Sequence, residues 1–289
     1  HMTRNAVCSQ KPTGLKTFLF GCPYYPEHWS SVDRADDAQR MADAGVNVVR
    51  MGEFAWDRIE SAAGRFDFSV FDEAIAELGQ FGIRTIFCTP TAAPPRWLTF
   101  GRDDWMRIDA KGVRMQHGSR QHCCTNNLDF RAESRRITGV LAEHYADNPN
   151  VIGWQTDNEF YCHIVACYCP SCQTMFRRWL ADRYQTLDAL NEAWGNSFWA
   201  VTYDALEQID IPIDGLPTYV SPSALLDWRL FLSDSLTAFQ KEQVDILRAA
   251  RADWWITHNG VFGGIDYPTF TEALDFLSVD TYQGFYGPI

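Results

Sequence analysis

The sequence predicts an α/β fold of the (β/α)8 TIM-barrel type, with about six of the eight strand-helix units present in its 289 residues. Short apolar stretches alternate with stretches of helical periodicity along the whole chain. Polar residues follow directly after the apolar stretches, where a barrel places its functional groups. The first predicted strand leads into Cys22-Pro23-Tyr24 and not into a glycine-rich phosphate turn. This difference disfavours a doubly wound open sheet.

The first predicted elements are a strand from Thr17 to Gly21 and a rigid aromatic loop. A helix over 30–44 has Ser30 or Ser31 as its N-cap and ends before Gly45. The next elements, in order, are a strand at 46–51, a helix at 68–81, a strand at 84–88 and a long loop over 89–127. Because a loop of this length is uncommon in a compact domain, we expect it to have a function.

The second half of the chain continues the alternation. Its predicted elements, in order, are a helix at 128–147, a strand from Val151 toward Glu159, a helix at 169–184, a less regular region to Pro222, a helix at 225–250, a strand at 255–259, a short helix at 268–273 and a strand at 276–282. A barrel closes with eight strands, so two further units would be needed. We therefore assign 1–16 to an N-terminal tail with a cloning remnant, and 17–289 to one barrel domain that is incomplete at its C-terminal end.

The composition indicates a globular protein, with 46% hydrophobic residues and enough length to bury a full core. The formal net charge is −12 and no basic cluster interrupts it, which disfavours nucleic acid and anionic membranes as partners. We find no signal peptide and no membrane-spanning run, so we expect a soluble cytoplasmic protein. The nine cysteines, an odd number, do not suggest a disulfide scaffold.

The stretch Val151–Phe160 is a buried strand that ends in an acid, an amide and a second acid. We predict that Glu159 is a general acid, because desolvation beside Trp154 and Phe160 can keep its carboxyl group protonated near neutral pH. Asn158 can both donate and accept a hydrogen bond, which suits a sugar hydroxyl. The alternative is a strand-end acid that caps the next helix.

Five motifs together resemble the N-terminal catalytic barrel domain of the glycoside hydrolase family 42 β-galactosidases, from about residue 20 to the end. They are Gly21-Cys-Pro-Tyr-Tyr-Pro-Glu-His-Trp29, Arg50-Met-Gly-Glu-Phe-Ala-Trp56, Pro90-Thr-Ala-Ala-Pro-Pro-Arg-Trp97, Trp154-Gln-Thr-Asp-Asn-Glu159 and Cys167-Tyr-Cys-Pro-Ser-Cys172. The resemblance implies a retaining β-galactosidase that hydrolyses terminal β-D-galactosyl residues of small oligosaccharides. It implies that Glu159 is the general acid/base and that Asn158 and Arg120 contact the galactose. Tyr282 is a weaker candidate for the same pocket.

A retaining mechanism also needs a nucleophilic carboxylate about 5–5.5 Å from the acid/base. In the family this nucleophile is a glutamate at the end of the seventh strand, which is expected beyond residue 289. Glu53 and Asp280 are less favoured, because the nucleophile must attack from the face opposite the acid; we expect them to orient Arg50 or the loops. Two alternatives stay open: a catalytically incompetent partial-barrel fragment, or a related barrel glycosidase that acts on α-L-arabinosides or β-fucosides.

Three cysteines within six positions open a predicted helix: Cys167, Cys169 and Cys172. With a fourth thiolate they would form a closed, structural zinc site. The resemblance places the fourth ligand at Cys124, with the adjacent Cys123 as an alternative and His163 as a lesser option. Such a site would tie the long loop to the segment after Glu159, whereas free buried thiols are the other interpretation. The oligomeric state stays open, with the trimer that is common in the family as one candidate.

Overall fold

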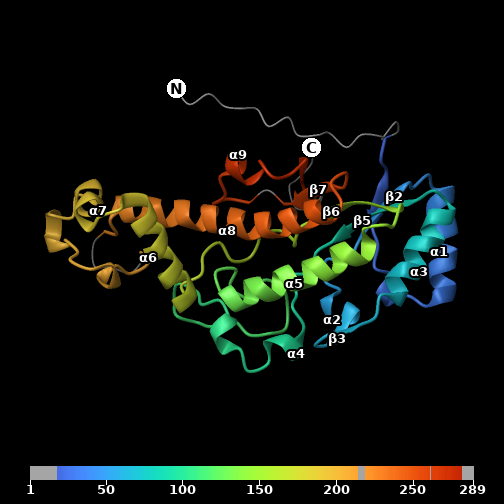
Figure 1. The fold of residues 1–289 in the computed structure, drawn as a ribbon, viewed down its shortest axis with the longest axis horizontal. Coiled ribbons are helices and arrows are strands. Elements are labelled where there is room, and N and C mark those ends of the chain that lie inside the picture. Colours follow the sequence, from blue (N-terminus) through green and yellow to red (C-terminus); the bar gives the residue numbers. More distant parts are fainter. Residues whose placement is uncertain (1–17, 214–218, 261, 282–289) are drawn as a thin grey trace.

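A computed structural model describes residues 18–213, 219–260 and 262–281 (Figure 1). Six parallel strands form one sheet whose spatial order follows the sequence. They are β1 (Gly21–Pro23), β2 (Val48–Met51), β5 (Arg84–Cys88), β6 (Val151–Gln155), β7 (Trp255–Asn259) and β8 (Phe276–Ser278). Each connection between neighbouring strands contains one or more helices. The predicted fold class, a (β/α)8-type barrel with about six units present, is thereby confirmed as a partial barrel.

The strand register brings the C-terminal ends of the strands together at one edge of the sheet. Gln155 of β6 pairs with Cys88 of β5 and with Thr257 of β7, and Asn259 of β7 pairs with Ser278 of β8. The segments that follow these strands therefore meet in one place. This is the edge at which β/α barrels build their sites.

The helices divide into two groups along the molecule (Figure 1). The long α8 (Pro222–Ala250) follows the long axis and packs beside α5 (Leu128–Tyr145), with α6 (Pro170–Tyr184) and α7 (Leu187–Trp194) near one end. At the opposite end, α1 (Ser31–Asp43) and α3 (Ser69–Gln80) pack together beside the first strands. The short elements are α2 (Trp56–Ile59), α4 (Arg96–Thr99), α9 (Tyr267–Phe270) and a hairpin of β3 (Glu60–Ala62) with β4 (Arg65–Phe66).

Several predicted boundaries were wrong. The described part of the chain begins at residue 18, and the first strand begins at Gly21, near the end of the predicted strand; a Cβ atom at Gly21 would lie 1.6 Å from the Val48 carbonyl oxygen, so the close pairing of β1 with β2 requires glycine there. The region before Pro222 was predicted to be irregular, but it contains α7, which Thr186 caps through the Ala189 amide. The last strand ends at Ser278.

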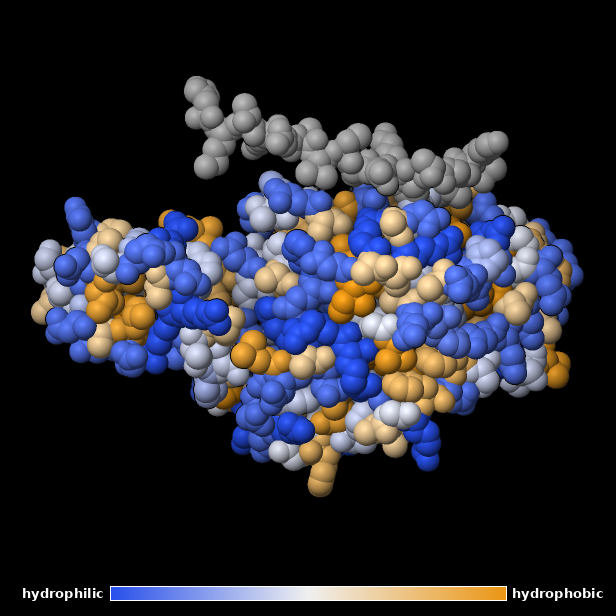
Figure 2. Space-filling model, viewed as in Figure 1, coloured by the Kyte–Doolittle hydropathy of each residue, from blue (hydrophilic) through white to orange (hydrophobic). Residues whose placement is uncertain are grey.

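The outer strands of the six-stranded sheet are β1 and β8, and they do not pair with each other. Apolar side chains lie exposed near β8, including Phe276 with 40% of its surface accessible. On the face seen in Figure 2, hydrophobic residues form several separate patches among hydrophilic ones. Among the described helices, none combines the length and apolar character needed to cross a bilayer.

Glu60 anchors the β3–β4 hairpin to the body of the molecule. Its fully buried carboxylate accepts hydrogen bonds from Trp56 Nε1 (2.9 Å), the Gly64 amide (2.8 Å) and Arg136 Nη2 of α5 (2.8 Å). Burial alone would raise the pKa of Glu60, but these three bonds and the charge of Arg136 outweigh it and hold the pKa below 4.5. The carboxylate therefore stabilises the folded state in its charged form.

We expect Glu60→Gln to lower the free energy of unfolding by about 2 kcal/mol at pH 7, because a buried anion with three donors is lost. Since the folded-state pKa is lowered, this difference is fully present above the unfolded value near 4.5 and shrinks as pH falls through the folded value. Urea unfolding of both proteins over a pH series measures it. The matched control is Glu133→Gln, which removes a half-buried partner of the same Arg136 (2.7 Å). If Glu60→Gln lowers the free energy of unfolding no more than this control does, the stabilising role of the Glu60 carboxylate is contradicted.

Candidate active site

The backbone after β6 has an unusual conformation. Asp157 (φ 50°), Glu159 (φ 46°) and Tyr161 (φ 64°) all adopt the left-handed region, which residues other than glycine rarely occupy. Each such residue costs of the order of 1 kcal/mol and persists only where its surroundings hold it. Strained backbone of this kind is concentrated at functional sites.

Two residues at the end of β7 hold this segment in place. Asn259 accepts a hydrogen bond from the Glu159 amide (3.0 Å) and donates to Asn158 Oδ1 (3.1 Å). His258 accepts from the Phe160 amide through Nε2 (3.2 Å) and pairs with the Thr156 carbonyl through Nδ1 (2.8 Å). Burial lowers the pKa of His258 to about 4, so its ring is neutral and carries its proton on Nδ1.

Gln121 holds the same segment from the opposite side. This buried residue lies in the long loop, and its Nε2 donates to the carbonyls of Asn158 (2.8 Å) and Glu159 (2.6 Å). Gln121 itself has a positive φ of 60°. No sequence pattern marks Gln121 as a site residue, although it follows Arg120 directly. Only the fold shows that its amide faces two carbonyls that are distant in sequence.

The carboxyl group of Glu159 lies at the centre of the site, and only 6% of the residue is exposed. Its Oε2 accepts from Arg120 Nη1 (2.9 Å) and from Asn158 Nδ2 (3.3 Å), and the carboxyl group of Asp280 lies beside it. Burial, followed by the interaction with Asp280, raises the pKa of Glu159 above 4.5, while Arg120 opposes the rise.

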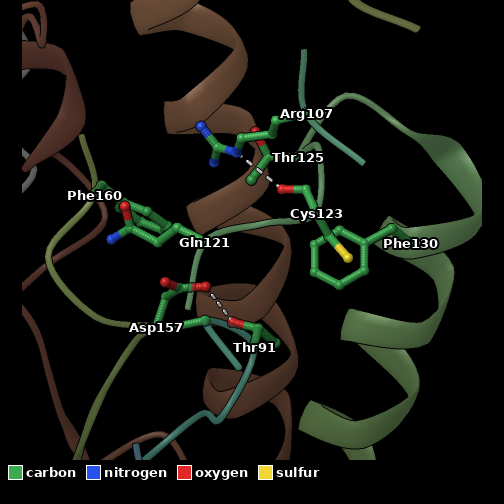
Figure 3. Close-up of a pocket in the computed structure, with 9 residues that line it drawn as sticks. Thr91, Arg107, Gln121, Cys123, Thr125, Phe130, Asp157 and Phe160 are labelled. Carbon is green, nitrogen blue, oxygen red and sulfur yellow. Dashed lines mark hydrogen bonds between the residues drawn. The ribbon is translucent and has the colours of Figure 1, made fainter. Parts of the chain in front are cut away.

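A small cavity adjoins this segment (Figure 3). Its volume is about 10 Å³. The Asp157 carboxylate, whose pKa burial raises to about 6, accepts a hydrogen bond from the Thr91 hydroxyl there. Gln121 and Phe160 line the same cavity. A sugar needs a pocket of roughly 300 Å³ or more, so this cavity is not a substrate pocket.

The remaining predicted residues have clear positions with one exception. Glu53 is buried, accepts from the Tyr25 hydroxyl (2.7 Å) and pairs with Arg50 (3.2 Å), so it orients that arginine as expected. Asp280 also accepts from Asn259 Nδ2 (2.8 Å). Tyr282 lies outside the described residues.

Four buried cysteines form a second cluster next to the site. The sulfur atoms of Cys124, Cys167, Cys169 and Cys172 all lie within 4.8 Å of one another, and those of Cys124 and Cys172 are 3.4 Å apart. Asn126 donates to both of these sulfurs, at 3.3 Å each. The four thiols could hold a metal ion.

Cys123 does not belong to this cluster. Its side chain lines the cavity of Figure 3, and burial raises its pKa to about 12. Of the two adjacent candidates for the fourth ligand, the geometry therefore selects Cys124.

Known proteins are similar to this chain over nearly its whole length. A β-galactosidase of Haloferax lucentense is 45% identical over 265 residues, which cover 91% of this chain and 40% of the relative. A β-galactosidase of a Thermus species is 43% identical over 267 residues, which cover 91% of this chain and 41% of the relative. The chain thus spans about two fifths of the length of these relatives.

A solved structure of similar fold is the β-galactosidase from the psychrophilic Marinomonas ef1. It superposes with a TM-score of 0.89 at 40% identity, over 92% of this chain and 41% of that chain. The family model of glycoside hydrolase family 42, described as β-galactosidase, matches residues 23–287. The motifs, the partial barrel and these similarities agree, and the chain belongs to glycoside hydrolase family 42.

Proposed function

We propose that this chain supplies the acid/base half of a retaining β-galactosidase that acts on small galactosides. The observation that carries the proposal is the buried Glu159, whose raised pKa suits a proton donor near neutral pH. The chain spans about 40% of the Haloferax lucentense relative, whose name gives it β-galactosidase activity. The nucleophilic glutamate of the retaining mechanism is expected beyond residue 289.

In the first step the nucleophile attacks the anomeric carbon while Glu159 gives its proton to the leaving glycosidic oxygen. Glu159 is then a carboxylate and takes a proton from the water that hydrolyses the glycosyl-enzyme. Arg120 and Asn158 already donate to this carboxylate and can donate to sugar hydroxyls instead. When Arg120 turns to the sugar, its opposition to the raised pKa of Glu159 weakens, which favours the protonated acid.

Neither of the two described acids considered for the nucleophile, Asp280 and Glu53, meets its requirements. The Asp280 carboxyl group interacts directly with that of Glu159, whereas the two carboxyl groups of a retaining site lie about 5–5.5 Å apart and flank the scissile bond. The Glu53 carboxylate already accepts a hydrogen bond from the Tyr25 hydroxyl and forms an ion pair with Arg50. These contacts support a nucleophile supplied by the remaining strand-helix units of a complete barrel.

The test compares wild type, Glu159→Gln and the exposed-site control Glu272→Gln, each joined to a segment that supplies the two remaining strand-helix units. We expect Glu159→Gln to lower hydrolysis of a β-galactoside with a poor leaving group by about 10²–10⁴-fold, because general acid catalysis is lost. The loss should be smaller in the first step for dinitrophenyl β-galactoside, whose leaving group needs no proton. Added azide should restore turnover, because it attacks the glycosyl-enzyme without a general base.

Equal losses on both substrates, with no response to azide, would contradict the acid/base role. Faster hydrolysis of an α-L-arabinoside or a β-fucoside would support the same mechanism with a different sugar as the preferred substrate. If the joined wild-type protein folds and hydrolyses none of these substrates, the alternative of an incompetent barrel replaces the proposal.

We propose further that the four-cysteine cluster holds a structural zinc ion. Four sulfurs around zinc at about 2.3 Å lie about 3.8 Å apart, which is compatible with the observed limit of 4.8 Å. Cys169 occupies the N-cap position of α6 and Cys172 lies in its first turn, where the helix dipole favours thiolates. Because Cys124 lies in the same loop as Arg120 and Gln121, the ion would fix that loop against α6 beside Glu159.

Protein purified without chelator should contain about one zinc ion per chain. Removal of the ion, or Cys169→Ser, should lower the melting temperature by about 5 °C or more, since metal binding contributes directly to folding. Elemental analysis and thermal unfolding measure the two effects. Cys22→Ser, at an exposed cysteine outside the cluster, is the control and should change neither. Free thiols without bound zinc, or an unchanged melting temperature, would overturn this assignment.

A further inference from the structure

A second group of possible metal ligands surrounds the acid/base itself. A carboxylate oxygen of Glu159, the thiol of Cys162 and a ring nitrogen of His163 lie within 4.8 Å of one another. The turn after Glu159 creates this arrangement, because the Cys162 amide donates to the Glu159 carbonyl (3.0 Å). None of these three residues belongs to the four-cysteine cluster.

Arg120 shows that two of these ligands point at one cationic group. Its Nη1 is 2.9 Å from Glu159 Oε2 and its Nη2 is 2.8 Å from His163 Nε2. A guanidinium has donors only, so His163 Nε2 accepts this bond and its lone pair faces the arginine. A neutral imidazole nitrogen and a carboxylate that both face a cation are arranged as metal ligands are.

The surroundings favour an incoming cation and allow it to enter. Asp280 adds a second carboxyl group beside Glu159. Cys162 is half-buried and its thiol lies within 4.8 Å of a Glu159 carboxylate oxygen, whereas His163 is exposed. The arginine that now lies between the ligands has 29% of its side chain accessible, so it can leave toward solvent.

We propose that Glu159, Cys162 and His163 form a low-affinity site for a borderline divalent cation such as zinc, which binds by displacing the guanidinium of Arg120. Sulfur, nitrogen and oxygen ligands in this combination suit zinc, with water in the fourth position. On binding, the Cys162 thiol and the protonated fraction of Glu159 give their protons to solvent, and the thiolate and the carboxylate coordinate the ion.

Occupation of this site would inhibit the proposed reaction, because a metal-bound Glu159 can neither donate nor accept a proton. This consequence rests on the proposed function, but the binding itself does not. The site would therefore make hydrolysis sensitive to free zinc without any separate regulatory domain.

The test measures zinc binding by the chain itself after the four-cysteine cluster has been filled. In equilibrium dialysis against micromolar zinc, wild type should bind about two ions per chain, whereas Cys162→Ser and His163→Gln should bind about one. Cys22→Ser, which removes an exposed cysteine elsewhere, should still bind two. Circular dichroism of each variant confirms that the fold is retained.

The second part of the test measures zinc binding by Arg120→Ala. Because it removes the competing cation, it should tighten the second zinc by about tenfold, or 1.4 kcal/mol. Unchanged stoichiometry in both Cys162→Ser and His163→Gln, or weaker binding in Arg120→Ala, would overturn the proposal. The readout is bound zinc and not hydrolysis. The zinc site can therefore be disproved while the proposed galactosidase function stands, and the function can be disproved while the zinc site stands.

Discussion

The site depends on the way in which one strained backbone segment is held from two sides. Asp157, Glu159 and Tyr161 have positive φ angles that they would not keep in isolation. Asn259 at the end of β7 binds the amide of Glu159, and Gln121 in the long loop binds its carbonyl. The direction of the Glu159 side chain is therefore set by residues about 100 positions later and about 40 positions earlier in the sequence.

Opposing electrostatic effects meet at the Glu159 carboxyl group. Burial and Asp280 disfavour its charged form, whereas Arg120 favours it. The net rise in pKa favours the protonated form of Glu159, which a proton donor needs. Because Arg120 lowers this pKa, a ligand that moves Arg120 away would raise the pKa of Glu159 further. The same geometry explains the proposed affinity for a metal ion, since a cation that replaces Arg120 meets Glu159, Cys162 and His163 together.

Much of the fold could be predicted from sequence because its signals are local. The strands Arg84–Cys88 and Trp255–Asn259 have the predicted bounds, since each is a short stretch set between predicted helices, and Ser30 caps α1 as expected. The cysteine cluster was also readable from spacing and family resemblance. Gln121 was not, because its importance comes from a long-range contact with carbonyl groups, which no local pattern encodes. Likewise, β1 was misplaced because its bounds follow its pairing with β2, in which Gly21 lies opposite Val48, and the apolar content of the sequence does not encode this pairing.

The central claim is that Glu159 is held as a proton donor, and the most direct test is its own titration. An NMR titration of the chain labelled with ¹³C in its glutamate carboxyl groups, with Glu159→Gln to assign the signal, gives this pKa in the folded state. We predict a value above the ordinary 4.5, because burial and Asp280 outweigh Arg120. A value at or below 4.5 would mean that Arg120 dominates, and it would contradict the acid role of Glu159 in this chain.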